Sequence, residues 1–145
     1  MKIKFLGTGS AKTSLIRFHS SLLISSSKQN LLVDCGDGIS KAILKQNINF
    51  NSIDSILISH FHADHIAGLD DFPQATYIYF KPAYEAVRRR TGFAAVRAGF
   101  LPGLLPLDFE QRSRPVDLTM MAPLSLAYLP FVEAVDLFGD GTILA

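Results

Sequence analysis

The stretch that decides the fold is Ile56-Leu57-Ile58-Ser59-His60-Phe61-His62-Ala63-Asp64-His65-Ile66-Ala67-Gly68. It begins with an apolar run, which is typical of a buried strand. The run ends at a polar cluster that holds three imidazoles and one carboxylate within six residues, and a helix-like stretch follows. The sequence therefore predicts a buried strand that leads directly into a group of metal-ligating side chains.

The spacing within this cluster sorts the four side chains into two pairs. His60 and His62 are two residues apart, and in extended chain such residues project to the same side, so both imidazoles can reach one metal. Asp64 and His65 come after the turn and can face a second metal beside the first. Nitrogen and carboxylate donors suit zinc and can also serve iron, manganese or cobalt. A solvated polar turn with chance histidines is the alternative interpretation.

A His-x-His-x-Asp-His motif after an apolar strand resembles the signature of the metallo-β-lactamase superfamily. The resemblance implies that His60 and His62 bind one metal and that Asp64 and His65 bind the other, with two zinc ions in a complete site. It also implies that Asp64 orients a metal-bound hydroxide and relays its proton, which makes Asp64 the candidate catalytic residue. Together with the histidine motif, two glycine-rich segments look most like the ribonuclease Z branch, the transfer-RNA 3′-processing endonucleases: Gly7-Thr8-Gly9 and Asp34-Cys35-Gly36-Asp37-Gly38.

The order of the expected elements fits the first half of a metallo-β-lactamase fold. Residue patterns predict strands over 2–6, 20–25 and 30–34, a helix over 39–46, and a strand over 53–58. The fold class is therefore expected to be α/β, the N-terminal half of an αββα sandwich with a mixed sheet and helices on one face. Further strands or helices are expected beyond the motif, at 75–80, 82–90, 93–100, 132–136 and 141–144.

Three single residues near these segments bear on the site. Asp34 leaves a buried strand next to glycines, and a buried carboxylate is costly unless it is hydrogen-bonded. The resemblance implies that Asp34 holds a ligand imidazole in place; a turn or helix-cap residue is the alternative. Asp37 fits a helix cap. His19 has no counterpart among the superfamily's ligands, so an ordinary surface or core histidine is expected there.

The composition excludes several classes of protein. With 145 residues, 48% hydrophobic and 19% charged, the chain can form a globular domain with a real core. The formal net charge of +1 gives no general attraction to nucleic acid or anionic membranes, and no apolar run approaches the length of a membrane span. Cys35 is the only cysteine, which fits a reducing cytoplasm, and the start of the chain does not read as a signal peptide.

The composition also changes along the chain near Leu69-Asp70. All four Asn lie before residue 70 and all seven Pro lie after it. We hypothesise that two halves with different coding backgrounds meet at a seam, residues 69–71, within a single partial domain over 1–145; drift in a short chain is the alternative. The second half loosely resembles lactonase-like members of the superfamily, at Asp71-Phe72-Pro73, Arg90-Thr91-Gly92 and Leu137-Phe138-Gly139-Asp140-Gly141.

The superfamily needs further ligands from the second half of its fold. These are another histidine for the first metal, and a bridging aspartate and a last histidine for the second. The sequence stops at Ala145 before any of them, so we expect the second half of the fold to be missing. Two histidines leave a metal with too few ligands, and a half-fold leaves one face of its sheet uncovered. Self-association or a complementing chain is therefore expected.

Two functions remain open from the sequence. The first is a metal-dependent hydrolase, with zinc as the expected metal, in which a metal-bound hydroxide attacks a phosphodiester in RNA or a lactone or other ester. The second is a catalytically incomplete fragment that acts as a weak metal binder or an interaction module. In neither case does the sequence predict a contact with membranes.

Overall fold

The computed structural model describes residues 1–9 and 17–145. These residues form two compact units, 1–115 and 116–145, and each unit is described by itself. The prediction of a single partial domain over 1–145, with a seam at 69–71, stays a prediction.

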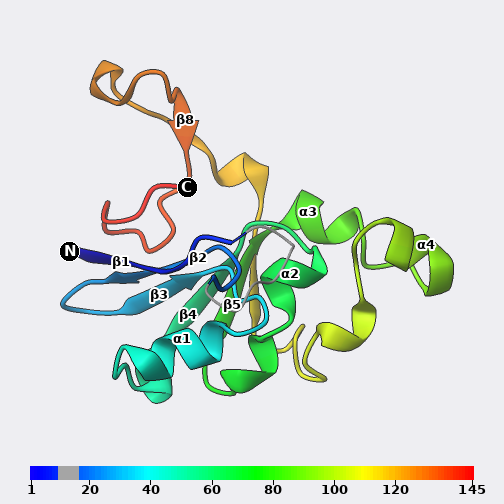
Figure 1. The fold of residues 1–145 in the computed structure, drawn as a ribbon. Coiled ribbons are helices and arrows are strands. Elements are labelled where there is room, and N and C mark those ends of the chain that lie inside the picture. Colours follow the sequence, from blue (N-terminus) through cyan, green and yellow to red (C-terminus); the bar gives the residue numbers. More distant parts are fainter. Residues whose placement is uncertain (10–16) are drawn as a thin grey trace. The chain divides into compact units, whose positions relative to one another are not determined.

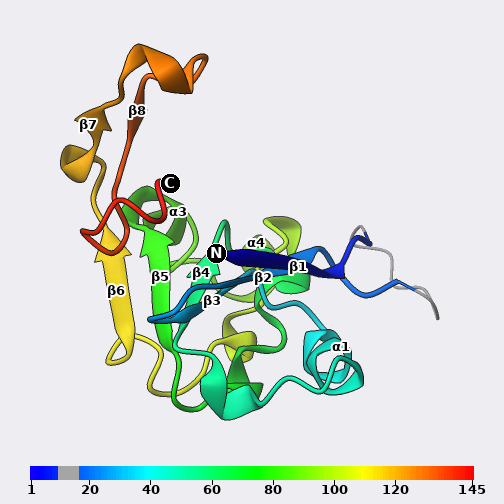
Figure 2. The ribbon, with the colours of Figure 1, turned by 90° about the vertical axis from the view of Figure 1, so that its left-hand side faces the viewer.

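A six-stranded mixed sheet organises the first unit (Figure 1). The strands lie in the order β1-β2-β3-β4-β5-β6, which Figure 2 shows from a second side. Neighbours among β1, β2 and β3 are antiparallel, whereas β3, β4 and β5 are parallel. The predicted α/β class with a mixed sheet is confirmed. The strands span Lys2–Gly7 (β1), Ser21–Ser25 (β2), Asn30–Val33 (β3), Ser55–Ile58 (β4), Thr76–Phe80 (β5) and Ser113–Val116 (β6).

Short helices connect the strands. They span Ile39–Lys45 (α1), Ala63–Ile66 (α2), Lys81–Glu85 (α3) and Gly92–Arg97 (α4). The helix predicted over 39–46 is confirmed, whereas the one predicted over 82–90 ends at Glu85 and continues as turns. The predicted cap at Asp37 is wrong, because α1 is entered through Gly38 in a left-handed conformation with no side-chain cap. Single 3₁₀ turns cover Phe50–Ser52, Leu69–Asp71 and Pro102–Leu104.

The centre of the core lies at β4, the strand that leads into the histidine motif. Ile56 and Ile58 are fully buried, as are Leu32 on β3 and Tyr77 on β5. β4 has a parallel neighbour on each side, and central parallel strands are rich in large aliphatic residues because they are buried. The apolar run of the sequence is therefore the middle of the sheet, and the polar cluster emerges at its carboxyl end.

Arg112 ties the chain after the seam to the sheet. Its guanidinium donates to both carboxylate oxygens of Asp108, at 2.8 and 2.9 Å, and to the Tyr77 hydroxyl at 2.6 Å. It also donates to the carbonyl oxygens of Phe72 and Ala75, at 3.0 and 2.8 Å. All five N–H groups of an arginine are thus used, which fixes the start of β5 against the segment that precedes β6.

The second unit has little regular structure. Strands Ala122–Pro123 (β7) and Glu133–Ala134 (β8) pair antiparallel, and 3₁₀ turns cover Leu118–Met120 and Leu126–Tyr128. The hairpin predicted between 132–136 and 141–144 is present as backbone pairing, with a bridge between Asp136 and Leu144 and a bond from Leu137 N–H to the Ile143 carbonyl. β8 itself pairs with β7, which the sequence did not predict.

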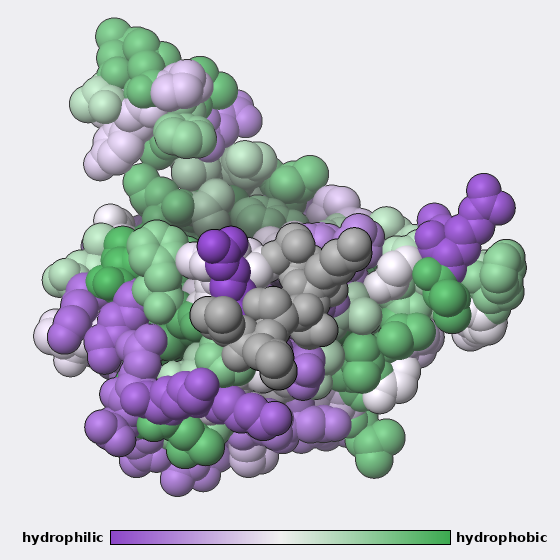
Figure 3. Space-filling model, in the orientation of Figure 1, coloured by the Kyte–Doolittle hydropathy of each residue, from purple (hydrophilic) through white to green (hydrophobic). Residues whose placement is uncertain are grey.

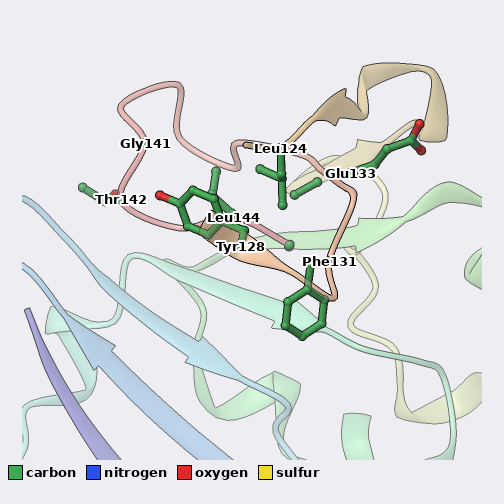
Figure 4. A pocket seen from close by; sticks show the side chains of 9 residues that line it. Leu124, Tyr128, Phe131, Glu133, Gly141, Thr142 and Leu144 are labelled. Carbon is green, nitrogen blue, oxygen red and sulfur yellow. The ribbon is translucent and has the colours of Figure 1, made fainter. Parts of the chain in front are cut away.

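Apolar side chains are conspicuous on this second unit. Figure 3 shows hydrophobic colour over much of the β7–β8 segment, where Leu126 and Phe131 are 83% and 71% exposed. A cavity of about 540 Å³ lies within the unit (Figure 4), lined by Leu124, Tyr128, Phe131 and Leu144 among others. The carboxylate of Glu133 extends away from Tyr128 in that view. The cavity is mainly apolar.

None of the helices formed by residues 1–9 and 17–145 has both the length and the hydrophobicity needed to cross a bilayer.

Candidate metal centre

The structure brings the predicted metal-binding side chains together beyond the end of β4. The rings of His60 and His62 have centroids 4.5 Å apart, and those of His60 and His65 lie 4.0 Å apart. Asp64 joins the group, with Oδ2 3.6 Å from Nε2 of His65. The expectation that His60 and His62 project to the same side is confirmed. All four side chains keep some contact with solvent, so a ligand can reach them.

Phe61 anchors the motif in the core while its two neighbours face outward. Its ring is 2% exposed and contacts four aromatic rings at centroid distances of 5.0 to 6.4 Å. Aromatic pairs at such distances stabilise beyond the area that they bury. The side chain thus fixes the extended backbone that sets the direction of both histidines. The four rings all follow the seam in sequence: Tyr79, Tyr84, Phe100 and Phe109.

Asp34 holds the motif from the other side. Its Oδ1 accepts a bond from the Ser59 backbone N–H at 2.8 Å, and its Oδ2 accepts one from the Ser59 hydroxyl at 2.8 Å. The same Oδ2 lies 2.8 Å from Nδ1 of His65. The predicted contact between this carboxylate and an imidazole of the motif is confirmed. Asp34 also has a φ of 56°, a costly conformation for a residue with a side chain, and such residues cluster at functional sites.

These contacts decide which nitrogen of each ring remains free. Nδ1 of His65 lies 2.8 Å from Oδ2 of Asp34, so a proton on Nδ1 faces the carboxylate and Nε2 keeps its lone pair. The Ser59 hydroxyl donates its hydrogen bond to Asp34, so its oxygen, 3.0 Å from Nδ1 of His60, accepts a hydrogen bond from the N–H of that ring. Nε2 of His60 is then free as well. One carboxylate therefore sets the tautomer of two imidazoles, as outer partners of metal-bound histidines do.

The same surroundings shift the proton affinities of two rings in opposite directions. The hydrogen bond to Asp34 raises the pKa of His65 above its usual value. Burial, followed by the neighbouring His65 and His62, lowers the pKa of His60. A lowered pKa keeps His60 neutral at physiological pH, and a neutral imidazole is the form that binds metal.

Two close backbone contacts place α2, the helix that carries Asp64 and His65. A Cβ atom at Gly36 would lie 1.9 Å from the Asp64 carbonyl oxygen, so only glycine fits there. A Cβ at Gly99, where φ is 69°, would lie 2.9 Å from Cδ2 of His62, and the Gly99 carbonyl accepts the Ala63 N–H at 2.9 Å. Residues on both sides of the seam therefore shape the motif.

The donor set fits two incomplete metal sites better than one complete site. Within residues 1–9 and 17–145, no three side chains of His, Cys, Asp or Glu are placed to hold one metal ion together. His60 and His62 present nitrogen donors as one pair, and Asp64 with His65 presents an oxygen and a nitrogen as another. These atom types match the preferences of zinc, but each pair needs further ligands.

The sequence missed one residue of this region. His19 is 6% exposed and lines a cavity of about 550 Å³ together with Asp37, His62, Asp64, Leu101 and Leu104. Of the two expected alternatives, a surface or a core histidine, the structure shows the buried one. The residue nevertheless lies at the candidate site. The spacing of His19 from Ser21 could have indicated this, because residues two apart in extended chain share a side. The Ser21 hydroxyl donates to the Asp34 carbonyl, so that side faces Asp34.

Comparisons with known proteins identify relatives of the segment that carries this site. A family model described as Anti-Pycsar protein Apyc1 matches residues 1–88. Ribonuclease Z of Methanopyrus kandleri is 41% identical over 76 residues, which are 52% of this chain and 26% of the relative. The Anti-Pycsar protein Apyc1 of Bacillus phage BSP38 is 43% identical over 70 residues, 48% of this chain and 27% of the relative. The chain thus spans about a quarter of the length of these curated relatives.

A solved structure extends the likeness of fold beyond the matched segment. A subclass B3 metallo-β-lactamase from a soil metagenome library superimposes with a TM-score of 0.58 at 22% identity, over 86% of this chain and 46% of that one. The predicted resemblance of the chain to the metallo-β-lactamase superfamily, and of its N-terminal half to ribonuclease Z, is confirmed. The looser resemblance of the second half to lactonase-like members stays a prediction.

Proposed function

Because the chain belongs to the Anti-Pycsar protein Apyc1 family, we propose that it supplies part of the active site of a metal-dependent phosphodiester hydrolase. The single observation that carries the proposal is the convergence of His60, His62 and His65 beside Asp64, with Asp34 fixing the outward nitrogens. Chance histidines in a solvated turn would not share one buried carboxylate as their orienting partner.

The proposed ligands divide into two pairs. His60 and His62 would hold one metal, and Asp64 and His65 would hold a second. Zinc is the proposed ion because nitrogen and carboxylate donors match its preferences. When bound, such a metal pair activates water and polarises a substrate oxygen.

The residues of this chain would then position and deprotonate. Asp34 keeps the rings of His60 and His65 in the orientation and tautomer that a metal requires. Asp64 would be the catalytic residue, because it lines the cavity and its carboxylate can accept a hydrogen bond from the attacking water and take its proton. The apolar side chains of Leu101 and Leu104 line the same cavity and would limit access of bulk water.

A phosphodiester is favoured over a lactone or other ester as the substrate. The relative with 41% identity is named as a ribonuclease, and RNA is joined by phosphodiesters. The likeness to a metallo-β-lactamase, at 22% identity, concerns the fold. RNA or a smaller phosphodiester is thus the proposed substrate class, and the ester remains the second arm of the test.

Completion of the site is part of the proposal. Each pair of ligands needs partners from beyond these four residues, and a second copy or a complementing chain would provide them. The lone, buried Cys35 supports a cytoplasmic setting, where thiols stay reduced.

A second candidate function is a weak metal binder or interaction module without catalysis. It is favoured by one observation: no three donors in the described part of the chain are placed around one metal.

The decisive experiment measures bound metal and turnover on the same sample. The protein is loaded with zinc, dialysed, and assayed for metal per chain, for oligomeric mass, and for hydrolysis of bis(p-nitrophenyl) phosphate and of a simple lactone. The expected result is that the protein retains zinc and hydrolyses the phosphodiester. Hydrolysis of the phosphodiester should disappear in Asp64→Asn. Zinc retention without turnover of either compound would favour the non-catalytic binder, and turnover of the lactone alone would contradict the proposed substrate class.

A further inference from the structure

The cavity beside the histidine motif contains a polar group that no interaction in the fold explains. His19 is 6% exposed, and neither of its ring nitrogens has a hydrogen-bond partner within the described residues. A neutral imidazole carries one donor and one acceptor, and buried polar groups are almost always paired. An unpaired, buried ring that lines a cavity is a group prepared for a ligand.

The backbone holds this ring firmly in its place. His19 forms a parallel bridge with Gly9, the Gly9 N–H donates to the Phe18 carbonyl at 2.8 Å, and the Ser20 hydroxyl donates to the Gly9 carbonyl at 2.9 Å. On the other side the ring packs against Gly36, where a Cβ atom would lie 2.7 Å from Nδ1 of His19. The ring is therefore pre-positioned, which reduces the entropy lost when a ligand binds.

The remaining walls of the cavity indicate the kind of ligand. His62 and Asp64, which belong to the two proposed metal pairs, line the same cavity of about 550 Å³. Ala63, Ala67, Leu101 and Leu104 provide apolar surface. Such a lining suits a small ligand with one polar centre near the metals and an apolar part along the leucines.

We assign His19 no place in the first metal pair. His19 lines the same cavity as His62, yet the described residues include no group of three donors around a common point. A donor that lines this cavity outside the two proposed metal pairs is placed to contact a substrate.

We propose that His19 is a substrate-binding residue, whose ring N–H donates a hydrogen bond to a non-bridging oxygen of the phosphodiester. The proposal rests on the proposed function, since the substrate oxygen would be brought to the ring by the metals. Asp37 and Asp64 also line the cavity and would repel an anion in the absence of metal. Binding of the phosphodiester is therefore expected only in the zinc-loaded protein.

The test separates metal binding from anion binding. Zinc is titrated into the metal-free wild type, His19→Phe and His19→Gln, and dimethyl phosphate, an unreactive phosphodiester, is then titrated into the zinc-loaded forms. His19→Phe keeps an aromatic ring without a donor, and His19→Gln keeps a donor. Imidazole NMR signals follow the titration, and because the chain has four histidines each signal can be assigned by single substitution.

The expected result is a zinc affinity within twofold of wild type for both variants. Dimethyl phosphate should bind His19→Phe about tenfold more weakly, which corresponds to about 1.4 kcal/mol, and His19→Gln should recover part of the loss. The His19 signal should move on addition of the diester. If His19→Phe does not fold, the affinity of His19→Gln for dimethyl phosphate and the shift of the His19 signal in wild type test the proposal.

Three results would overturn the assignment: unchanged diester binding in His19→Phe, a zinc affinity reduced tenfold in the same variant, or zinc-loaded wild type that binds no diester. The second would make His19 a metal ligand. Wild type that binds no zinc would instead refute the proposed function itself, so the two failures are distinguishable.

Discussion

In residues 1–115 the large side chains of the central strands are buried, whereas in residues 116–145 many apolar side chains face solvent. Ile56 on β4 is fully buried, while Leu126, Leu129 and Phe131 are 62% to 83% exposed. The second unit is held mainly by backbone pairing, as between Val135 and Ala145, and the first by packing around the sheet. The second unit thus shows that a segment can have paired backbone while few of its apolar side chains are buried.

The comparison also separates two boundaries. The composition changes at the seam, 69–71, but packing continues across it: Phe61 contacts the rings of Tyr79 and Phe109 from beyond the seam, and β4 pairs with β5. The compact unit ends only at residue 115. Whatever the origin of the two compositions, the candidate site is shaped by both.

The largest expected difference comes from a matched pair of truncations. Ile56→Ala removes buried atoms from the centre of the sheet and should lower the free energy of unfolding by about 2–5 kcal/mol. Leu126→Ala changes an exposed side chain in the second unit and should alter it by less than about 0.5 kcal/mol. Urea denaturation followed by circular dichroism measures both. Equal losses for the two variants would contradict the contrast between the units.

A smaller effect is expected when the contacts that hold residues 108–112 to β5 are weakened. Arg112→Lys keeps the charge but cannot make five bonds in a planar fork, so several buried acceptors lose their partner. The expected loss is about 2 kcal/mol in the free energy of unfolding, measured in the same denaturation experiment. Arg89→Lys is the control, because Arg89 is exposed and should tolerate the change. Similar stabilities for both variants would show that Arg112 does not hold the unit together.

The smallest expected effect is a pH dependence of stability that arises from the contact between Asp34 and His65. The pKa of His65 is raised by Asp34, so their pairing stabilises the folded, metal-free chain fully below the unfolded value of about 6.5, and the stabilisation is lost as pH rises through the folded pKa. The loss of stability in Asp34→Asn relative to wild type should therefore be larger at about pH 6 than at about pH 8.5.

The exposed carboxylate of Asp37 provides the control for this pH dependence. Asp37→Asn removes a charge nearby without touching the pair, so its effect on stability should not follow the same trend. A loss in Asp34→Asn that is independent of pH would mean that Asp34 acts through its bonds to Ser59 rather than through His65.

Sequence reasoning predicted the parts of the site that depend on local spacing. The alternation of His60, Phe61 and His62 in extended chain predicted that the two imidazoles share a side, and the position of Asp34 after a buried strand predicted a carboxylate that needs partners. The close contacts at Gly36 and Gly99, and the burial of His19 beside the motif, depend on segments far apart in sequence. Local patterns carry no record of such contacts, so they required the structure.

The fold was predicted to a similar depth. Five of the six strands of the mixed sheet follow from alternation and apolar runs, but the strand β6 at Ser113–Val116, the early end of α3 and the pairing of β7 with β8 do not. Arg112 shows why: in the sequence it is one basic residue among many, and its importance comes from Asp108, Tyr77 and two backbone carbonyls that surround it in space.

The measurement that tests the central claim most directly is a zinc titration of wild type and of the double variant His60→Ala/His62→Ala by calorimetry. If the motif is a metal centre, wild type should bind zinc, and the double variant should lose the site that this pair forms, with affinity there reduced at least about tenfold, as loss of metal-supporting contacts typically costs. Superimposable titration curves for the two proteins would contradict the account.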